Sequence, residues 1–323
     1  MGQRVNFSQR VRAGCARVMA VAEHVQVRAD RLADYARSLP LDMVATPQLD
    51  PAAHYFGSPE NTAAFFLQLD AINFGSGYFP HLVKLPGRSG YFTVATHLAT
   101  FFREHGPLTA EDLETLTPGD CSLIFRQDAP EPPITELMWL FSTALNDLGQ
   151  LVQKRFAGSF GRMVVAAGGS SQELIGILIA MRLFRDTASY RGFEVPFLKR
   201  AQLAVADLAL ALAGNGLGRF RDLAELTIFA DNLVPHVLRV DGLLEYVPEL
   251  AARIDGGVLL AAGSPEEVEI RAAAVHAVEL LRAELARQGR SVTAMQLDYL
   301  LWNRGQQPEY KARPRHRART VFY

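Results

Sequence analysis

One long segment with helical start and stop signals most constrains what this chain can fold into. The sequence SPEEVEIRAAAVHAVELLRAELARQG, residues 264–289, opens with Ser264 as an N-cap and Pro265 in the first helical position, and it closes at Arg287 and Gly289. Its apolar residues recur at helical spacing, which predicts one long helix. Three further segments with this spacing lie at 134–156, 196–214 and 291–306.

Sequence typical of strands is sparse. The best candidates are HVQV at 24–27 and SGYFTV at 89–94, and neither has a partner joined to it by a two-residue turn. A dinucleotide-binding loop follows a strand, and no predicted strand precedes GNGLG at 214–218. This segment is therefore interpreted as a turn between two helices. The sequence therefore predicts a mostly α fold with little β structure.

Length and one proline-rich segment predict the domain organisation. The 323 residues, 49% of them hydrophobic, can bury a large core as one domain or as two lobes. Residues 127–136, QDAPEPPITE, carry three prolines, which cannot continue a helix. We predict an N-terminal helical lobe with short strands at 1–130, a C-terminal helical lobe at 131–323, and an active site in the cleft between them.

Composition excludes several classes of protein. The 33 Lys and Arg residues and 34 Asp and Glu residues give a net charge of -1, which provides no global field for binding long nucleic acid. Cys15 and Cys121 have no neighbours at metal-ligand spacing, which predicts a reducing compartment and no metal site. The longest apolar run, 174–181, is too short to span a membrane, and the first residues lack the pattern of a leader. We expect a soluble cytoplasmic protein that acts on a small ligand.

The stretch LTIFADNLVPHVL, residues 226–238, places an acid in an apolar setting. Asp231 and Asn232 lie among apolar residues, and Pro235 and His236 follow within a turn. A carboxylate is costly there unless it is paired, hydrogen-bonded or used in function. Asp231 is interpreted either as the cap of a new short helix or as a functional carboxylate. The two roles are compatible, because a helix N-terminus holds a carboxylate oriented and ionised.

Lys199 and Arg200 stand in the first turn of a predicted helix, where the helix dipole disfavours cations. This position predicts a carboxylate or phosphate partner nearby. The alternative is that both side chains extend into solvent at the end of the helix.

The stretch FFLQLDAINFGSGYF, residues 65–79, surrounds two polar residues with aromatic ones. Asp70 and Asn73 are three residues apart and lie on one face if the helix extends that far. Phe74 and its aromatic neighbours could form the wall of a pocket for a flat heterocycle. The alternative is an aromatic core cluster with Asp70 exposed to solvent.

Two features of the last segment complete the candidate site. Asp298 and Trp302 are four residues apart and share a helix face. The tail KARPRHRARTVFY, residues 311–323, is basic but ends in apolar residues, which predicts that it docks on the body and gathers cations for a phosphate pocket. Its candidate binding residues are Arg313, His316, Arg317, Arg319 and Tyr323.

Several stretches, in one order along the chain, resemble the queuosine salvage proteins: LQLDAINFG, LTAEDLETL, VPFLKRAQLAVAD, TIFADNLVPHVL, VEIRAAAVHAVELL, LDYLLWNRGQ and PRHRARTVFY. The resemblance runs over most of the chain. It implies an N-glycosidase that releases the 7-deazaguanine base queuine from queuosine 5'-monophosphate, without a metal or an organic cofactor. It also implies a fold similar to helix-hairpin-helix DNA glycosylases.

The resemblance implies roles for individual residues. In helix-hairpin-helix glycosylases a Lys on one helix and an Asp after the hairpin face the sugar, and Lys199 and Asp231 match these two places. GNGLG departs from the usual Leu-Pro-Gly hairpin, which argues against a DNA-gripping role, as does the low net charge. Asp231 would stabilise or attack the cationic sugar, and Lys199 or Asn232 would assist the departing base.

Queuine carries a secondary ammonium and a cyclopentene diol, so its recognition calls for a carboxylate and aromatic faces. By residue type, Asp70, Asn73, Phe74 and Trp302 are the expected partners, with His236 and Asp298 as further binding residues. Two alternatives remain open. One is a DNA or RNA repair glycosylase, which would need an electropositive groove, and the other is a non-catalytic helical module that binds a nucleoside.

Overall fold

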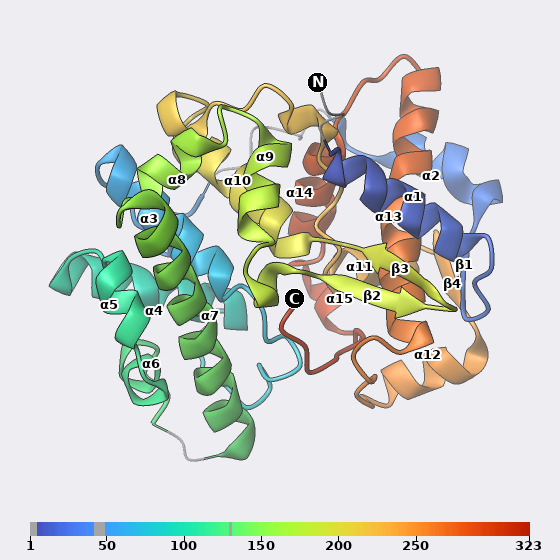
Figure 1. Ribbon diagram of the computed structural model, residues 1–323. Helices are drawn as coiled ribbons and strands as arrows, with labels where there is room; N and C mark the ends of the chain where they lie inside the picture. Colours follow the sequence, from blue (N-terminus) through green and yellow to red (C-terminus); the bar gives the residue numbers. More distant parts are fainter. Residues whose placement is uncertain (1–4, 42–48, 129–130) are drawn as a thin grey trace.

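The computed structural model describes residues 5–41, 49–128 and 131–323, and over these it is mostly α-helical (Figure 1). The helices are α1 (Phe7–Met19), α2 (Leu32–Ser38), α3 (Pro59–Ala71), α4 (Gly90–His105), α5 (Ala110–Thr115), α6 (Pro118–Ile124), α7 (Pro132–Phe156), α8 (Phe160–Ala166), α9 (Ser171–Leu178), α10 (Lys199–Ala211), α11 (Val234–Val240), α12 (Pro248–Asp255), α13 (Pro265–Arg287), α14 (Ala294–Arg304) and α15 (Pro308–Lys311). Two antiparallel strand pairs accompany them, β1 (Val25–Val27) with β4 (Leu244–Tyr246) and β2 (Thr187–Tyr190) with β3 (Phe193–Pro196). The mostly α fold class is confirmed.

The helices with clear caps begin and end where the sequence places them. The Ser264 hydroxyl accepts a hydrogen bond from the Glu267 amide at the start of α13, and α13 ends at Arg287 as predicted. Helices α7 and α14 match their predicted segments within a few residues. The helix predicted to start at Pro196 begins instead at Lys199, because residues 193–196 form β3 and Leu198 adopts a left-handed conformation with φ 54°.

The predictions for strands were correct in one place and wrong in another. Residues 25–27 form β1, which pairs with the distant β4. The segment 89–94 is the start of helix α4, and the Ser89 hydroxyl caps this helix by accepting a hydrogen bond from the Phe92 amide. The hairpin of β2 and β3 was not predicted. Its connecting residues, Arg191 and Gly192, both have positive φ, as a tight two-residue hairpin turn requires.

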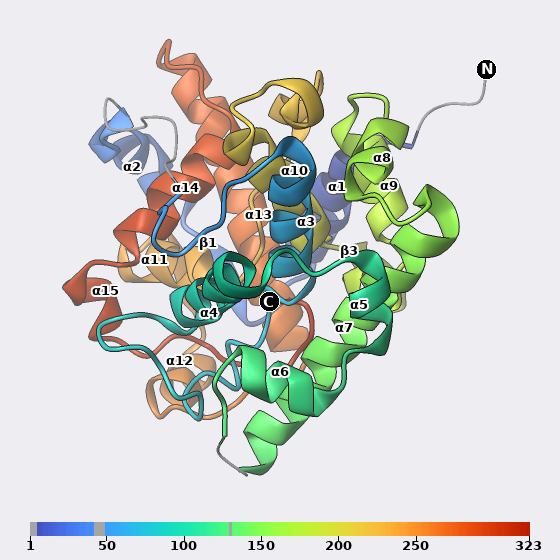
Figure 2. The same ribbon diagram turned by 90° about the vertical axis from the view of Figure 1, so that its left-hand side faces the viewer.

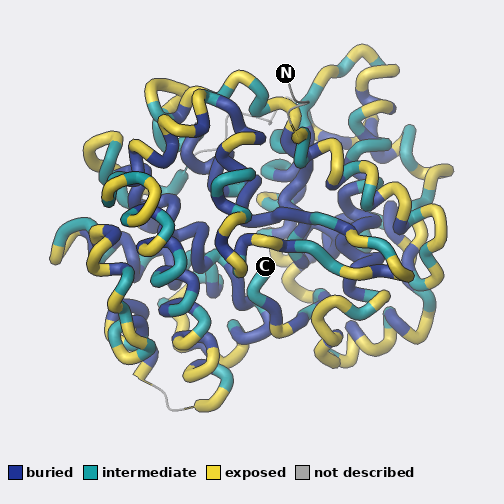
Figure 3. Tube along the Cα trace, in the orientation of Figure 1, coloured by how far each residue is buried: buried dark blue, intermediate teal, exposed yellow. Residues whose placement is uncertain are grey.

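The long helix α13 organises one side of the molecule, where α1 and α2 pack against it. On the other side, α3 packs against α7, α8 and α10. Buried apolar side chains from both sides form one continuous cluster, and Figure 3 shows buried positions concentrated inside the molecule. The division into 1–130 and 131–323 remains a prediction, and the residues at 129–130 lie outside the described part of the chain.

The basic tail docks on the body, as predicted. Ala318 and Tyr323 are buried, and the Tyr323 carbonyl accepts a hydrogen bond from the Gly75 amide at 3.0 Å. The Leu260 amide donates to the Arg317 carbonyl at 2.9 Å, which holds the tail against the segment before α13. Figures 1 and 2 both show the chain end marked C in the middle of the molecule.

Among the described residues, no helix combines the length and the apolar character needed to cross a membrane. Both cysteines are buried free thiols.

Candidate active site

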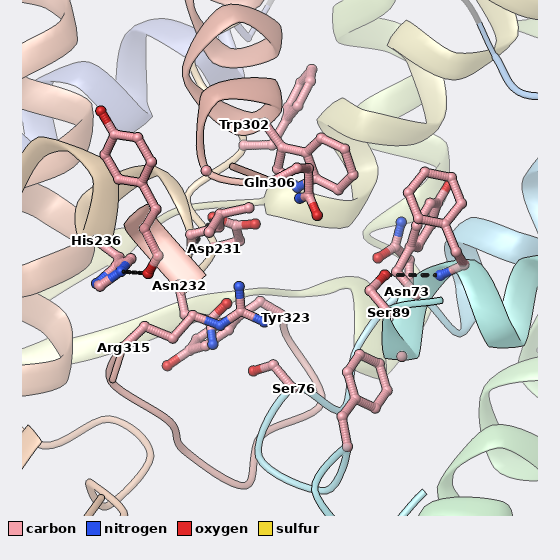
Figure 4. A pocket seen from close by; sticks show the side chains of 18 of the residues that line it. Asn73, Ser76, Ser89, Asp231, Asn232, His236, Trp302, Gln306, Arg315 and Tyr323 are labelled. Carbon is pink, nitrogen blue, oxygen red and sulfur yellow. Dashed lines mark hydrogen bonds between the residues drawn. The ribbon is translucent and has the colours of Figure 1, made fainter. Parts of the chain in front are cut away.

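A cavity of about 730 Å³ lies where α10, α11 and α14 meet the start of α4 and the docked tail. Its volume is in the range of small-molecule sites. Figure 4 shows Asp231, Trp302 and Gln306 on one side of this cavity, and Arg315 and Tyr323 on the opposite side. The wall combines residues from both predicted lobes.

Lys199 is the first residue of α10 and its side chain is buried. Its ammonium donates to the backbone carbonyl and the side-chain oxygen of Asn73, both at 3.1 Å, and its amide donates to the Asp186 carboxylate at 3.1 Å. Burial lowers the pKa of Lys199, whereas the charges of Asp231 and Asp70 oppose this shift. The alternative in which this side chain extends into solvent is therefore wrong.

Arg200 is also buried, so the solvent alternative is wrong for it too. Its guanidinium donates to the backbone carbonyls of Ala71 and Leu183 and lies between the rings of Phe74 and Phe184, 4.8 and 4.7 Å from their centroids. The dipole argument predicted a carboxylate or a phosphate as partner. The direct partners of Arg200 are instead carbonyl oxygens and aromatic faces, and it supports the wall behind Phe74.

Asp231 holds the turn that leads into α11. The N-cap of this helix is Leu233, not Asp231 as the cap interpretation predicted. Asp231 Oδ1 accepts hydrogen bonds from the amides of Leu233 at 2.8 Å and Val234 at 3.1 Å, and its other carboxylate oxygen accepts no hydrogen bond from the described residues. These two bonds fix the orientation of Asp231 and leave Oδ2 for the cavity that Asp231 lines.

The extended segment before Asp231 is held rigidly by three buried side chains. Gln202 accepts from the Thr227 amide at 2.9 Å and Asp298 accepts from the Phe229 amide at 2.9 Å. The guanidinium of Arg271 donates to the Ala230 carbonyl at 2.9 Å. Asp231 is therefore placed by contacts from three helices, α10, α13 and α14.

Arg271 also reaches the start of α10. Its Nη1 and Nη2 donate to the two oxygens of Asp186 at 3.0 and 2.6 Å, and Asp186 in turn accepts from the Lys199 amide. The guanidinium stacks on the rings of Phe197 and Tyr323, 4.0 and 4.8 Å from their centroids. One buried arginine thus connects the segments that carry Lys199 and Asp231.

Three further carboxyl groups lie in or behind the wall. Asp207 and Asp298 line the cavity, and Asp70 is fully buried and lies outside the lining. Burial raises the pKa of all three: that of Asp207 to about 7, and those of Asp70 and Asp298 well above their usual range, with further contributions from neighbouring acids. The alternative of a solvent-exposed Asp70 is wrong.

Aromatic side chains form much of the remaining wall. Trp302 makes edge contacts with Tyr91 and Phe92, at centroid distances of 6.3 and 6.0 Å, and all three line the cavity. The hydroxyl of Tyr91 is 2.9 Å from Nε2 of His54. Such a wall suits a flat ring system.

Residues 315–320 of the tail alternate in burial, as the residues of an extended segment do. Arg313, Arg315 and Arg317 line the cavity. His316 points into the core, where burial lowers its pKa to about 3, so it is neutral. Arg319 is exposed and lies 5.5 Å over the Tyr78 ring, away from the cavity.

The structure brings most of the predicted site residues to one cavity. The lining includes Asn73, Phe74, Lys199, Asp231, Asn232, His236, Asp298, Trp302, Arg313, Arg317 and Tyr323, whereas Asp70, His316 and Arg319 lie outside it. Asp207 and Tyr299 also line the cavity and were not predicted, and Arg315 was predicted only as one of the cations of the tail. The spacing of Lys199, Leu203 and Asp207, four residues apart on one helix, was the signal that could have identified Asp207.

Asn232 and His236 link α11 to the tail. The Asn232 amide donates to the His316 carbonyl at 3.1 Å, and Nε2 of His236 is 2.8 Å from the Tyr310 carbonyl.

Among the described residues, no three His, Cys, Asp or Glu side chains gather in an arrangement that could hold a metal ion.

A mostly helical protein with a buried lysine, several carboxyl groups and aromatic faces around one cavity has the features of an enzyme acting on a small molecule. The model of the queuosine salvage protein family matches residues 53–323, and the chain belongs to this family.

Three relatives illustrate the similarity. The chain is 39% identical over 312 residues to a protein of Sphaerobacter thermophilus, a match that covers 95% of each chain. It is 32% identical to a protein of Bos taurus over 83% of each chain, and 36% identical to one of Mus musculus over 62% of each. All three relatives are named queuosine 5'-phosphate N-glycosylase/hydrolase.

Proposed function

We propose that this protein hydrolyses the N-glycosidic bond of queuosine 5'-phosphate and releases the base queuine. The observation that carries this proposal is an oriented Asp231 with one carboxylate oxygen free, facing the same cavity as the buried ammonium of Lys199. The names of the curated relatives support the choice of substrate.

The chemistry explains why a fixed carboxylate is needed. As the bond between C1' and the base breaks, the electron pair leaves with the base and positive charge develops on the sugar. Asp231 stabilises this charge with its free oxygen, or attacks C1' directly. Water then supplies the hydroxyl group at C1'. The other proton of this water replaces the proton that the base takes up as it leaves.

The departing base needs help because queuine has carbon in place of the purine nitrogen at position 7 and cannot be activated by protonation there. Lys199 has one N–H left after its two hydrogen bonds to Asn73, and this donor can stabilise the charge on the base. The lowered pKa of Lys199, caused by burial, also makes it a better proton donor.

The 5'-phosphate is assigned to the tail. Arg313, Arg315 and Arg317 offer guanidinium groups, which bind phosphate oxygens in a bidentate way. The Asp231 carboxylate acts on the charge of Arg315, which indicates that the phosphate site lies close to the reacting sugar.

We also propose that a helix-hairpin-helix arrangement explains the order of these elements along the chain. Lys199 starts α10, the short turn Gly216–Gly218 follows that helix, and Asp231 precedes α11.

The free buried thiols of Cys15 and Cys121 agree with a cytoplasmic location.

The test is to incubate the protein with queuosine 5'-phosphate, queuosine and damaged duplex DNA, and to measure the free base. We expect base release from queuosine 5'-phosphate and none from DNA. Release from DNA alone would favour a repair glycosylase, and tight binding of a nucleoside without release would favour a binding module.

A further inference from the structure

The proposed reaction leaves one buried acid of the cavity without a role. Asp207 is 4% exposed and lines the cavity, yet its one hydrogen bond is a long one, 3.4 Å, from the Tyr299 hydroxyl to Oδ1. No described residue donates to Oδ2. A nearly unpartnered carboxyl group that faces a cavity is costly for the fold, so a ligand group is its natural partner.

Asp207 lies two helical turns beyond Lys199 on α10. Lys199, Leu203 and Asp207 all line the cavity from one face of this helix. Eight residues of an α-helix correspond to about 12 Å, so the backbones of Lys199 and Asp207 lie about that far apart along the helix. Their charges still act on each other, because each group opposes the effect of burial on the pKa of the other.

The cavity wall carries charges of both signs. Arg313, Arg315 and Arg317 of the tail line it, and so do Asp207, Asp231 and Asp298. In and just behind the wall, four carboxyl groups stand around the ammonium of Lys199: Asp70, Asp207, Asp231 and Asp298. A ligand that carries both a phosphate and a cation would complement these charges.

The surroundings of Asp207 also suit an organic cation. The Tyr299 hydroxyl donates to Asp207, and the Tyr91 and Tyr299 side chains line the same cavity. Tyr91 in turn contacts the Trp302 ring. A carboxylate next to aromatic faces binds an ammonium ion through charge and cation–π attraction together.

We propose that Asp207, together with the aromatic side chains of the wall, forms an ammonium-binding subsite, which selects 7-deazaguanine nucleotides whose arm at position 7 carries a protonated amine. This subsite rests on the proposed function for the identity of the ligand. It also changes the expected partner of the arm, because Asp70 lies behind the wall and Asp207 lies on it.

The experiment measures binding of two free bases by calorimetry, so it requires no bond cleavage. The probes are 7-aminomethyl-7-deazaguanine, which has a cationic arm, and 7-cyano-7-deazaguanine, which has a neutral one. We expect the protein to bind the aminomethyl base at least tenfold more tightly. In Asp207→Asn this preference should fall below threefold, while affinity for the cyano base stays within threefold.

Asp255→Asn is the matched control, because Asp255 also lines the cavity but is paired with Arg239 at 2.9 Å. It should keep the full preference. A second measurement uses the unaltered protein with N-acetylated 7-aminomethyl-7-deazaguanine, whose arm is neutral, and its affinity should be at least tenfold lower than that of the amine. Equal affinity for the amine and the acetylated base, or an unchanged preference in Asp207→Asn, would overturn the proposal.

These outcomes separate the subsite from the reaction. If queuosine 5'-phosphate is not cleaved but the preference depends on Asp207, the proposed function fails and the subsite stands. If the substrate is cleaved and the preference is absent or independent of Asp207, the subsite fails and the function stands.

Discussion

The two carboxylate oxygens of Asp231 have different surroundings. Oδ1 accepts the amides of Leu233 and Val234 at the start of α11, and Oδ2 is left for the reaction that we propose. Because the side-chain oxygen of Asn can accept the same two bonds, a single substitution can separate the structural role from the proposed catalytic one.

Asp231→Asn should keep the fold and lose activity. Removing one preorganised charge costs about 3–4 kcal/mol of transition-state stabilisation, or roughly a hundredfold to a thousandfold in rate. The measurement is release of queuine in a single turnover, with thermal melting to establish that the variant is folded. A folded variant with unaltered turnover would show that Asp231 serves only the turn before α11.

Asp207 should make stability depend on pH in a defined direction. Burial raises its pKa to about 7 in the folded protein, whereas the unfolded chain has a value of about 3.9. Between these values the folded state holds a proton that the unfolded state has released, so stability falls as pH rises toward 7 and levels off above it.

Asparagine cannot ionise, so Asp207→Asn should remove this loss of stability. We compare the unfolding free energy of Asp207→Asn with that of the unaltered protein at the same pH. The value for the variant minus the value for the unaltered protein should increase by about 2–3 kcal/mol from pH 5 to pH 8. Urea unfolding of both proteins at the two pH values checks this. A constant difference across the range would mean that Asp207 does not titrate there.

At the scale of elements, the site depends on how α13 holds the start of α10 and the segment before α11. Arg271 on α13 bonds to Asp186, which accepts from the Lys199 amide, and to the Ala230 carbonyl. The carboxylates of Asp186 and Glu267 raise the pKa of Arg271 despite its burial. We propose that Arg271 positions Lys199 and Asp231, the two residues of the proposed reaction.

Arg271→Lys should lower kcat at least tenfold while KM changes less than threefold. Lysine keeps the charge but cannot bond to Asp186 and the Ala230 carbonyl at once, because it lacks the planar fork of arginine. Stability should fall by about 1–3 kcal/mol through the lost charged hydrogen bond. The check is steady-state kinetics together with thermal melting.

Arg282→Lys is the matched control, since it makes the same change on the same helix at a partly exposed pair with Glu279. It should leave kcat and KM unchanged. An equal loss of kcat in both variants, or full kcat in Arg271→Lys, would contradict a positioning role.

At the scale of the whole molecule, the charges nearly cancel, yet the tail concentrates cations at one cavity. The net charge is -1, but Arg313, Arg315 and Arg317 face a common space. This local field suits a single phosphate group better than a long polyanion.

Arg315→Met should reduce the preference for queuosine 5'-phosphate over queuosine by roughly tenfold to a hundredfold, because a charge-assisted hydrogen bond contributes about 1.5–3 kcal/mol. The measurement is kcat/KM for both substrates. Arg319→Met removes the same charge from an exposed position outside the cavity and should keep the preference. A loss of equal size in both variants would point to a general charge effect.

The sequence alone determined the elements whose signals are local. Capping residues and helical spacing are properties of adjacent residues, so α7, α13 and α14 could be predicted. The hydrogen bonds of Asp231 are local for the same reason, because its partners are amides two and three residues along the chain. The family resemblance implied that Lys199 and Asp231 share one site, which no spacing reveals, and both line the same cavity.

The tertiary structure decided the features that depend on distant partners. Residues 89–94 have the aromatic and β-branched composition of a strand, but in the fold they begin helix α4, which buries one of its faces. Burial, rather than residue type, separates Asp207 on the cavity wall from Asp70 behind it, and the cavity-facing Arg315 from the exposed Arg319. The physical reason is that the direction of a side chain depends on which elements pack around it, and these packing partners lie far away in the sequence.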